Sequence, residues 1–173
     1  TVNVTATAVT NITGSKTELA TTYGGGMTGL GNETITVSDA NITSAEANTI
    51  DAYTTGAVTA TISTTAIADL DDLTGTGNAY TITVGTADVT AAALNAVNAA
   101  TTVNVTASAV TAITGTASAL ATTYGGGITG LGNETVTVSD ADVTAAHLNT
   151  INAGTSVNVV ATAVTNITGS KTE

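Results

Sequence analysis

The stretch Thr135-Val-Thr-Val-Ser-Asp140, followed by the apolar residue Val143, sets the pattern for the whole chain. Apolar and polar residues alternate in it, as in a strand with one buried face. The pattern recurs, each time with apolar residues at the second and fourth places and another five residues later. The apolar triplets are Val2/Val4/Val9, Ile35/Val37/Ile42, Ala60/Ile62/Ile67, Ile82/Val84/Val89, Val103/Val105/Val110, Val136/Val138/Val143 and Val157/Val159/Val164.

The composition is that of a repetitive structural protein rather than an ordinary globular domain. The 173 residues include 43 Thr and no Pro, Cys, Trp or Phe, and only 9% are charged. The mean hydropathy of +0.34 argues against a disordered chain. The net charge of −11 argues against nucleic-acid binding, because a phosphate backbone is bound by Lys and Arg. No apolar run is long enough for a membrane helix, so we expect no membrane insertion.

Long internal repeats are the next feature of the sequence. Residues 1–50 align with residues 102–151 without gaps, and 37 of the 50 positions are identical. Residues 156–173 match residues 1–18 at 16 of 18 positions. These two segments, residues 1–18 and 156–173, begin 155 residues apart. We therefore expect the chain to be one segment of a longer array with a 155-residue super-period.

These repeats predict the fold class. We expect a repeat solenoid: a parallel β-solenoid with short helical segments, which is α/β with leucine-rich-repeat-like coils of 21–33 residues and a right-handed course. It would form one continuous segment over residues 1–173. The expected coils are residues 1–33, 34–58, 59–80, 81–101, 102–134, 135–155 and 156–173.

Two phrases between the strands have helical spacing. Asp142-Val-Thr-Ala-Ala-His-Leu-Asn-Thr-Ile-Asn places Val143, Leu148 and Ile151 roughly on one face, with Asp142 or Thr144 as the cap. The phrase that starts at Ile113 predicts a helix of about two turns capped by Thr116. A glycine-rich turn follows it.

The outward strand positions carry a series of threonines. Stacked in parallel they would form a ladder of hydroxyl and methyl groups, similar to the ice-binding face of β-solenoid antifreeze proteins. Threonine is also simply a good solvent-facing strand residue, and both interpretations remain open. The ladder residues are Thr34, Thr36, Thr59, Thr61, Thr81, Thr83, Thr135 and Thr137.

No residue set predicts catalysis, and we expect no enzyme, no catalytic residue and no required cofactor. The only metal candidates are weak calcium ligands, and helix N-capping and solubility explain these residues better. They are Asp69, Asp71, Asp72, Asp140 and Asp142. The single histidine, His147, has no repeated partner with which to form a metal site or a triad. The glycine matches Gly24/Gly26/Gly29 and Gly125/Gly127/Gly130 follow a helical phrase, so we interpret them as turns rather than as a dinucleotide-binding motif.

The phrases Thr-Val-Thr-Val-Ser-Asp, Leu-Asn-Thr-Ile-Asn-Ala and Ile-Thr-Gly-Leu-Gly-Asn-Glu resemble the tandem repeats of very large cell-surface proteins of marine cyanobacteria. The resemblance covers essentially the whole chain and carries no catalytic motif. It implies an extracellular or surface-attached, extended array. We therefore expect a structural repeat protein of an extracellular filament, adhesin stalk or surface layer that associates end to end. The alternative is a surface-binding protein that uses the threonine ladder on ice or carbohydrate.

Overall fold

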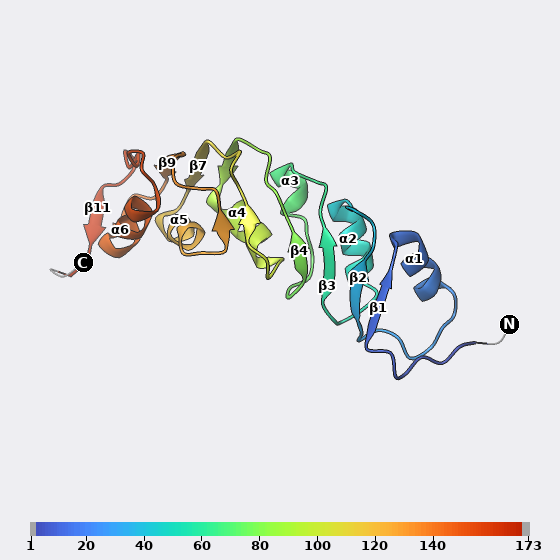
Figure 1. The fold of residues 1–173 in the computed structure, drawn as a ribbon. Coiled ribbons are helices and arrows are strands. Elements are labelled where there is room, and N and C mark those ends of the chain that lie inside the picture. The colour runs from blue at the N-terminus through green and yellow to red at the C-terminus, as the bar shows by residue number, and fades with distance from the viewer. Residues whose placement is uncertain (1–2, 171–173) are drawn as a thin grey trace.

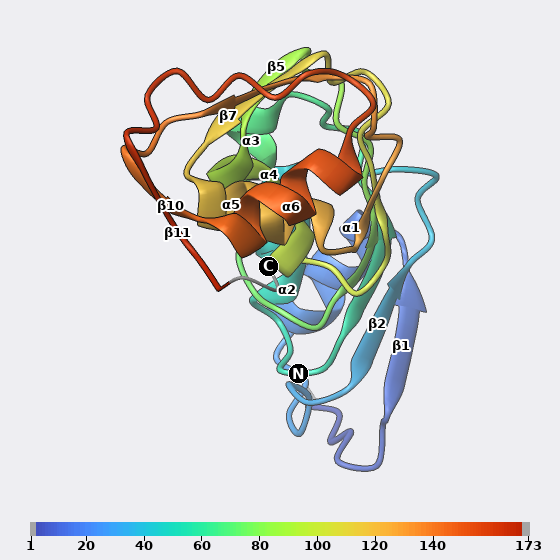
Figure 2. The same cartoon turned by 90° about the vertical axis from the view of Figure 1, so that its left-hand side faces the viewer.

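The chain forms an elongated stack of short helices and short strands. The computed structural model describes residues 3–170. Figure 1 shows the elements following one another along one long direction, with α1 and β1 near the N-terminus and α6 and β11 near the C-terminus. Viewed along that direction in Figure 2, the helices lie behind one another, with the strands and loops around them.

The described residues contain six helices and eleven strands. The helices are α1 (Lys16–Gly24), α2 (Ser44–Asp51), α3 (Ile67–Leu70), α4 (Ala91–Ala99), α5 (Ala117–Tyr124) and α6 (Ala145–Gly154). The strands are β1 (Asn11–Gly14), β2 (Thr34–Val37), β3 (Val58–Thr61), β4 (Ala79–Thr81), β5 (Asp88–Thr90), β6 (Val105–Thr106), β7 (Ala112–Gly115), β8 (Ile128–Thr129), β9 (Thr135–Val138), β10 (Asp142–Thr144) and β11 (Asn166–Thr168).

All the strand pairs are parallel, and each joins chain segments of nearly constant separation. The strands form a four-stranded sheet (β1-β2-β3-β4), a three-stranded sheet (β5-β7-β9) and two pairs (β6-β8 and β10-β11). Partners lie 23 residues apart at Asn11 and Thr34, 20 apart at Thr59 and Ala79, and 24 apart at Asp88 and Ala112. We call each stretch between one strand and its partner a layer.

The predicted fold class, one continuous parallel β-solenoid, is wrong. The molecule is an α/β structure in which the strands are divided among four small parallel sheets and the six helices carry much of the packing. Adjacent strands lie about 4.8 Å apart, whereas packed helices need about 8–10 Å. A stack with a helix in nearly every layer cannot meet both spacings along an unbroken ladder. We attribute the division into short sheets to this conflict.

Helices α5 and α6 begin directly after the capping residues Thr116 and Thr144, as the sequence predicts. The side chains of Thr116 and Thr144 accept hydrogen bonds from the third backbone N–H of α5 and α6, respectively, each at 3.2 Å. Val143 was expected on the helical face, but it belongs to β10. Ile113, which precedes the predicted cap Thr116, lies in β7. Both phrases therefore contain a short strand followed directly by a capped helix.

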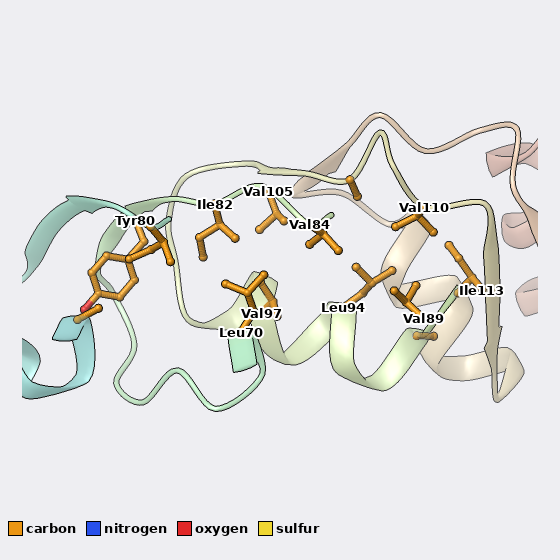
Figure 3. Packing of buried hydrophobic residues seen from close by; sticks show 14 of the residues in the cluster. Leu70, Tyr80, Ile82, Val84, Val89, Leu94, Val97, Val105, Val110 and Ile113 are labelled. Carbon is orange, nitrogen blue, oxygen red and sulfur yellow. The ribbon is translucent and has the colours of Figure 1, made fainter. Parts of the chain in front are cut away.

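The core lies between the strands and the helices along the whole stack. Figure 3 shows Ile82 and Val84 on one side of it, facing Leu94 and Val97 of α4 on the other. All four side chains are buried. Burying one such side chain stabilises a fold by about 1.5–3 kcal/mol. A single layer has only a few of these residues, so each layer depends on its neighbours for its core.

Not every predicted inward residue is buried. The expectation holds for the strand residues Ile35, Val37, Val105, Val136 and Val138. It is wrong for Val4, Val103 and Val157, which are exposed. Of these three, Val4 and Val157 lie near the two ends of the described stack. Val2 lies outside the described residues.

Candidate functional site: contacts between the layers

Threonine and serine hydroxyls bridge consecutive layers. At each bridge, one side chain donates a hydrogen bond to a backbone carbonyl oxygen 24 residues earlier. The donors and acceptors are Thr55 and Gly31 (3.2 Å), Thr102 and Asn78 (3.1 Å), Thr129 and Val105 (3.2 Å), Ser156 and Gly132 (2.8 Å), and Thr165 and Ala141 (3.3 Å). In four of these pairs, all except Thr129 and Val105, the backbone N–H of the same threonine or serine also donates to that carbonyl. The carbonyl has two lone pairs, so both bonds can form.

Two asparagines join one helical layer to the next with both ends of the side-chain amide. In α2, Asn48 Nδ2 donates to the carbonyl oxygen of Asp72 at 3.0 Å, and Asn48 Oδ1 accepts from the N–H of Thr74 at 2.8 Å. In α4, Asn95 Nδ2 donates to the carbonyl oxygen of Ala119 at 2.9 Å, and Asn95 Oδ1 accepts from the hydroxyl of Thr123 at 2.9 Å. Each amide thus fixes the position of the following layer.

A buried glutamate closes each glycine-rich loop. Glu33 and Glu134 are 1% and 0% exposed. Glu134 accepts hydrogen bonds from the hydroxyl of Tyr124, from the N–H of Gly132 at 2.7 Å and from the N–H of Asn133 at 3.0 Å. This tyrosine–glutamate clasp ties the end of α5 to the loop that follows it.

The first repeat contains the same clasp. Glu33 accepts hydrogen bonds from the hydroxyl of Tyr23 and from the N–H groups of Gly31 at 2.8 Å and Asn32 at 3.1 Å. Two equivalent positions, 101 residues apart, therefore carry one arrangement. Its recurrence identifies the clasp as part of the repeat.

The clasp changes the acidity of its groups. Burial acts to raise the pKa of Glu33, but the hydrogen bonds from Tyr23 and from the loop N–H groups outweigh it, and the pKa is lowered. Burial is the largest cause that raises the pKa of Tyr23, followed by the hydrogen bond to Glu33 and its charge. The pKa of Tyr124 is raised by burial and by Glu134 in the same way. At neutral pH the first clasp therefore consists of the neutral Tyr23 phenol and the Glu33 carboxylate.

Gly24 is the last residue of α1 and Gly125 is the C-cap of α5, and the other glycines of both matches lie in the turns that follow, as the sequence predicts. Gly29 and Gly130 have φ angles of +85° and +84°. A Cβ added at Gly29 would lie 2.6 Å from Thr7 Cγ2, and one added at Gly130 would lie 2.9 Å from the backbone nitrogen of Ser108. Glycine is needed at both positions because the turn packs directly against the preceding layer.

The structure divides the proposed threonine ladder among several rows. Thr36 pairs with Thr59, and Thr13 continues this row on the other side of Thr36. Thr61 pairs with Thr81, whereas Thr83 pairs with Thr106. The remaining ladder residues lie elsewhere. Thr34 pairs with Asn11, Thr135 with Ala112, and Thr137 with Thr114. All eight ladder residues are exposed or half-buried. Five of them lie on β2, β3 and β4 of one sheet, and Thr135 and Thr137 lie on β9 of another.

The weak calcium candidates lie in separate places. Asp140 and Asp142 line a cavity of about 240 Å³ together with His147. Asp69 and Asp72 line another of about 470 Å³, and Asp71 a third of about 480 Å³. Within residues 3–170, no three His, Cys, Asp or Glu side chains are grouped so that they could hold a metal ion.

Two of these carboxylates have structural hydrogen bonds. Asp140 accepts from the N–H of Ala117 at 3.0 Å, so it caps the first turn of the preceding layer's helix. Asp142 accepts from Asn166 Nδ2 at 3.1 Å, across the pair β10-β11. The first contact favours the capping interpretation for Asp140, whereas the second makes Asp142 a link between neighbouring strands. His147 is half-buried in α6, and its backbone N–H donates to Thr144.

Sequence reasoning missed the clasps and the asparagine contacts. An acidic residue that follows glycines normally lies in solvent, so nothing local marked Glu33 or Glu134 as buried. The available signal was the ten-residue interval between tyrosine and glutamate, which is the same in both long repeats. The Leu-Asn dipeptides of α4 and α6 likewise marked the asparagine position.

Comparison with known proteins adds no relative. The chain matches no family model, no curated protein and no solved structure. In the part of the chain that the structure describes, no helix has the length and apolar character needed to span a membrane. The function must therefore be argued from the repeat contacts themselves.

Proposed function

We propose that this chain is a structural repeat protein whose stacked layers build an elongated assembly, such as an extracellular filament, an adhesin stalk or a surface layer. The observation that supports this proposal most directly is the recurrence of one set of hydrogen bonds between layers. Hydroxyl-to-carbonyl bonds with a separation of 24 residues begin at Thr34 and recur up to Thr165. A contact set that repeats along the chain can set a length, because every added layer forms the same bonds.

Three further features support this proposal. Each layer buries apolar side chains only together with its neighbours, so stability favours long stacks. The net charge of −11 keeps the sides of such stacks apart and soluble. The extracellular location comes from the sequence resemblance to bacterial cell-surface repeats.

Electron microscopy of the material as the source organism makes it tests this function. We expect thin, uniform fibres or a regular layer. Strands stack about 4.8 Å apart, so six strand-bearing layers per 155-residue period set a lower bound of about 29 Å on the axial repeat. Compact, separate particles would contradict the proposal.

A second candidate function, binding to ice or carbohydrate, is favoured by one observation. Thr13, Thr36 and Thr59 form a continuous row on the outward side of β1, β2 and β3. No hydrogen bond to these hydroxyls is present among the described residues. Replacing Thr36 and Thr59 by Tyr would abolish thermal hysteresis or glycan binding if this row is the binding surface. An unchanged signal would contradict the assignment.

A further inference from the structure

A cavity of about 320 Å³ lies between α1 and α2, which are neighbours in the stack (Figure 1). Its volume is in the range of small-molecule pockets, which is about 300–1,000 Å³. We call it the α1–α2 groove. Because its two walls belong to consecutive layers, the groove opens on the side of the stack and not at an end. The walls include Lys16 and Ala20 of α1, Glu46, Thr49 and Ile50 of α2, and Tyr53 just after α2.

Three side chains of this groove differ from their counterparts in the second repeat. Lys16, Glu46 and Tyr53 align with Ala117, His147 and Gly154. The alanine, the threonine and the isoleucine of the groove are the same in both repeats. The three differing residues come from two layers, and only the fold brings them together. The first repeat therefore has an ion pair and an aromatic ring at a place where the second repeat has neither.

The aromatic wall of the groove is held rigidly. The ring of Tyr53 stacks on the ring of Tyr23, with 4.8 Å between the ring centroids and 12° between the ring planes. The hydroxyl of Tyr23 is in turn held by Glu33 in the first clasp. In the second repeat, a Cβ added at Gly154 would overlap the ring of Tyr124, so that ring packs directly on the glycine. The clasp thus supports an exposed aromatic platform only in the first repeat.

A fixed donor and a fixed acceptor lie at the other end of the groove. Lys16 Nζ donates to Glu46 Oε1 at 2.6 Å, and Glu46 Oε2 accepts from the N–H of Thr43 at 2.9 Å. The two side chains are 44% and 35% exposed, so a ligand can reach them. An ammonium group has three N–H donors and a carboxylate has about four lone-pair positions. Both groups therefore keep hydrogen-bonding capacity beyond their own ion pair.

These charges favour a neutral ligand. An anion would be repelled by Glu46, by Asp39, which accepts from the backbone N–H of Lys16 at 2.6 Å, and by the net charge of −11. A cation would be repelled by the Lys16 ammonium. A wholly apolar ligand would cover the ion pair without replacing its water. A sugar ring offers a flat face of C–H groups for Tyr53 and hydroxyl groups that both donate and accept.

We propose that the α1–α2 groove binds a neutral sugar ring, either as a free saccharide or as one unit of a glycan chain. The apolar face of the ring lies on Tyr53, and its hydroxyl groups accept from Lys16 and donate to Glu46. This binding is an addition to the stacking function and does not depend on it. The groove is also separate from the row formed by Thr13, Thr36 and Thr59.

Nuclear magnetic resonance titration of the 173-residue chain tests the groove. The probes are the methyl glycosides of glucose, galactose and mannose, and separately the soluble polysaccharides dextran and mannan. We expect shifts at Lys16, Ala20 and Tyr53, with a dissociation constant of about 1 mM for a ligand of about a dozen heavy atoms. Ala121 and Thr150 of the second repeat are the internal control and should not shift. Shifts with a free glycoside support binding of a single saccharide, and shifts with a polysaccharide alone support binding within a glycan chain.

Substitutions separate the ring contact from the polar contacts. Tyr53→Ala should weaken binding about tenfold or more, whereas Tyr53→Phe, which keeps the ring, should stay within about threefold. Lys16→Ala should weaken binding about threefold or more, and this exposed position leaves the core intact. Glu46 is left unchanged because it also caps α2. The matched control is Thr21→Ala on α1, whose hydroxyl bonds to the carbonyl oxygen of Thr17, and it should leave the dissociation constant unchanged.

Three results would overturn the proposal. The first is the absence of shifts with every glycoside and polysaccharide, and the second is equal shifts in the two repeats. The third is an unchanged dissociation constant in Tyr53→Ala when its far-ultraviolet circular dichroism shows an intact fold. Shifts of the groove residues by tetramethylammonium but by no sugar would likewise overturn the assignment, because they would identify a cation site. None of these results bears on the layer contacts, so the proposed structural function is tested separately by microscopy.

Discussion

Replacing Tyr124 by Phe removes one hydroxyl from the centre of a buried clasp and leaves the ring in place. That hydroxyl donates to Glu134, whose side chain is fully buried and retains only the N–H groups of Gly132 and Asn133 as partners. A hydrogen bond to a charged group contributes about 1.5–3 kcal/mol. We therefore expect the free energy of unfolding to fall by about 2 kcal/mol, which for a chain of this size lowers the melting temperature by about 4–8 °C.

Urea unfolding followed by far-ultraviolet circular dichroism at pH 7 measures this loss. The matched control is Tyr53→Phe, because the ring of Tyr53 stacks on that of Tyr23 at 4.8 Å and its hydroxyl bonds to no described residue. We expect the control to change the free energy of unfolding by less than about 0.5 kcal/mol. If the two variants lose the same stability, the clasp does not stabilise the fold and the reasoning is refuted.

Three further changes test other contacts. Asn95→Ala should lower the free energy of unfolding in urea by about 1–3 kcal/mol, because the amide of Asn95 joins two layers. Asn149→Ala should lower it by less than about 0.5 kcal/mol in the monomer, because Asn149 is exposed. Similar losses in the two variants would contradict the importance of the Asn95 contact. Gly29→Ala should lower the melting temperature by several degrees, because this position has a φ of +85° and the added Cβ would meet Thr7 of the preceding layer. An unchanged melting temperature would show that the turn does not need glycine here. The pKa of Glu33 is lowered from 4.5, so its contribution to stability is present above pH 4.5 and is lost as the pH falls through the folded-state pKa. Melting curves of the unmodified chain and of Glu33→Gln should therefore converge on acidification.

The sequence predicted the local structure better than the way the layers join. Alternating apolar residues such as Val136 and Val138 identified buried strand positions, and Thr116 and Thr144 identified helix starts. Both features depend on neighbours within a few residues. Val143 was assigned to a helix because its spacing to Leu148 and Ile151 fits a helical face as well as a strand that leads into the helix.

Features that depend on distant partners could not be predicted in the same way. The burial of Glu134 requires Tyr124 and two loop N–H groups to converge on it, and no local pattern encodes that convergence. The division into four sheets follows from competition between strand spacing and helix spacing, which acts over several layers. The register of the threonines also depends on distant partners, because the strand pairs lie 20 to 24 residues apart: Thr36 pairs with Thr59, whereas Thr59 pairs on its other side with Ala79.

The layer-to-layer hydrogen bonds also determine how the molecule would respond to tension. They join consecutive layers along the long direction in Figure 1, so a pull on the two ends acts along the bonds rather than across them. Bonds loaded in this way break one layer at a time. Each released layer of 23 residues, such as Asn11 to Thr34, would add up to about 80 Å of extended chain. A fibre made of such layers would lengthen in steps under load, and each step would dissipate energy and could be reversed when the load falls.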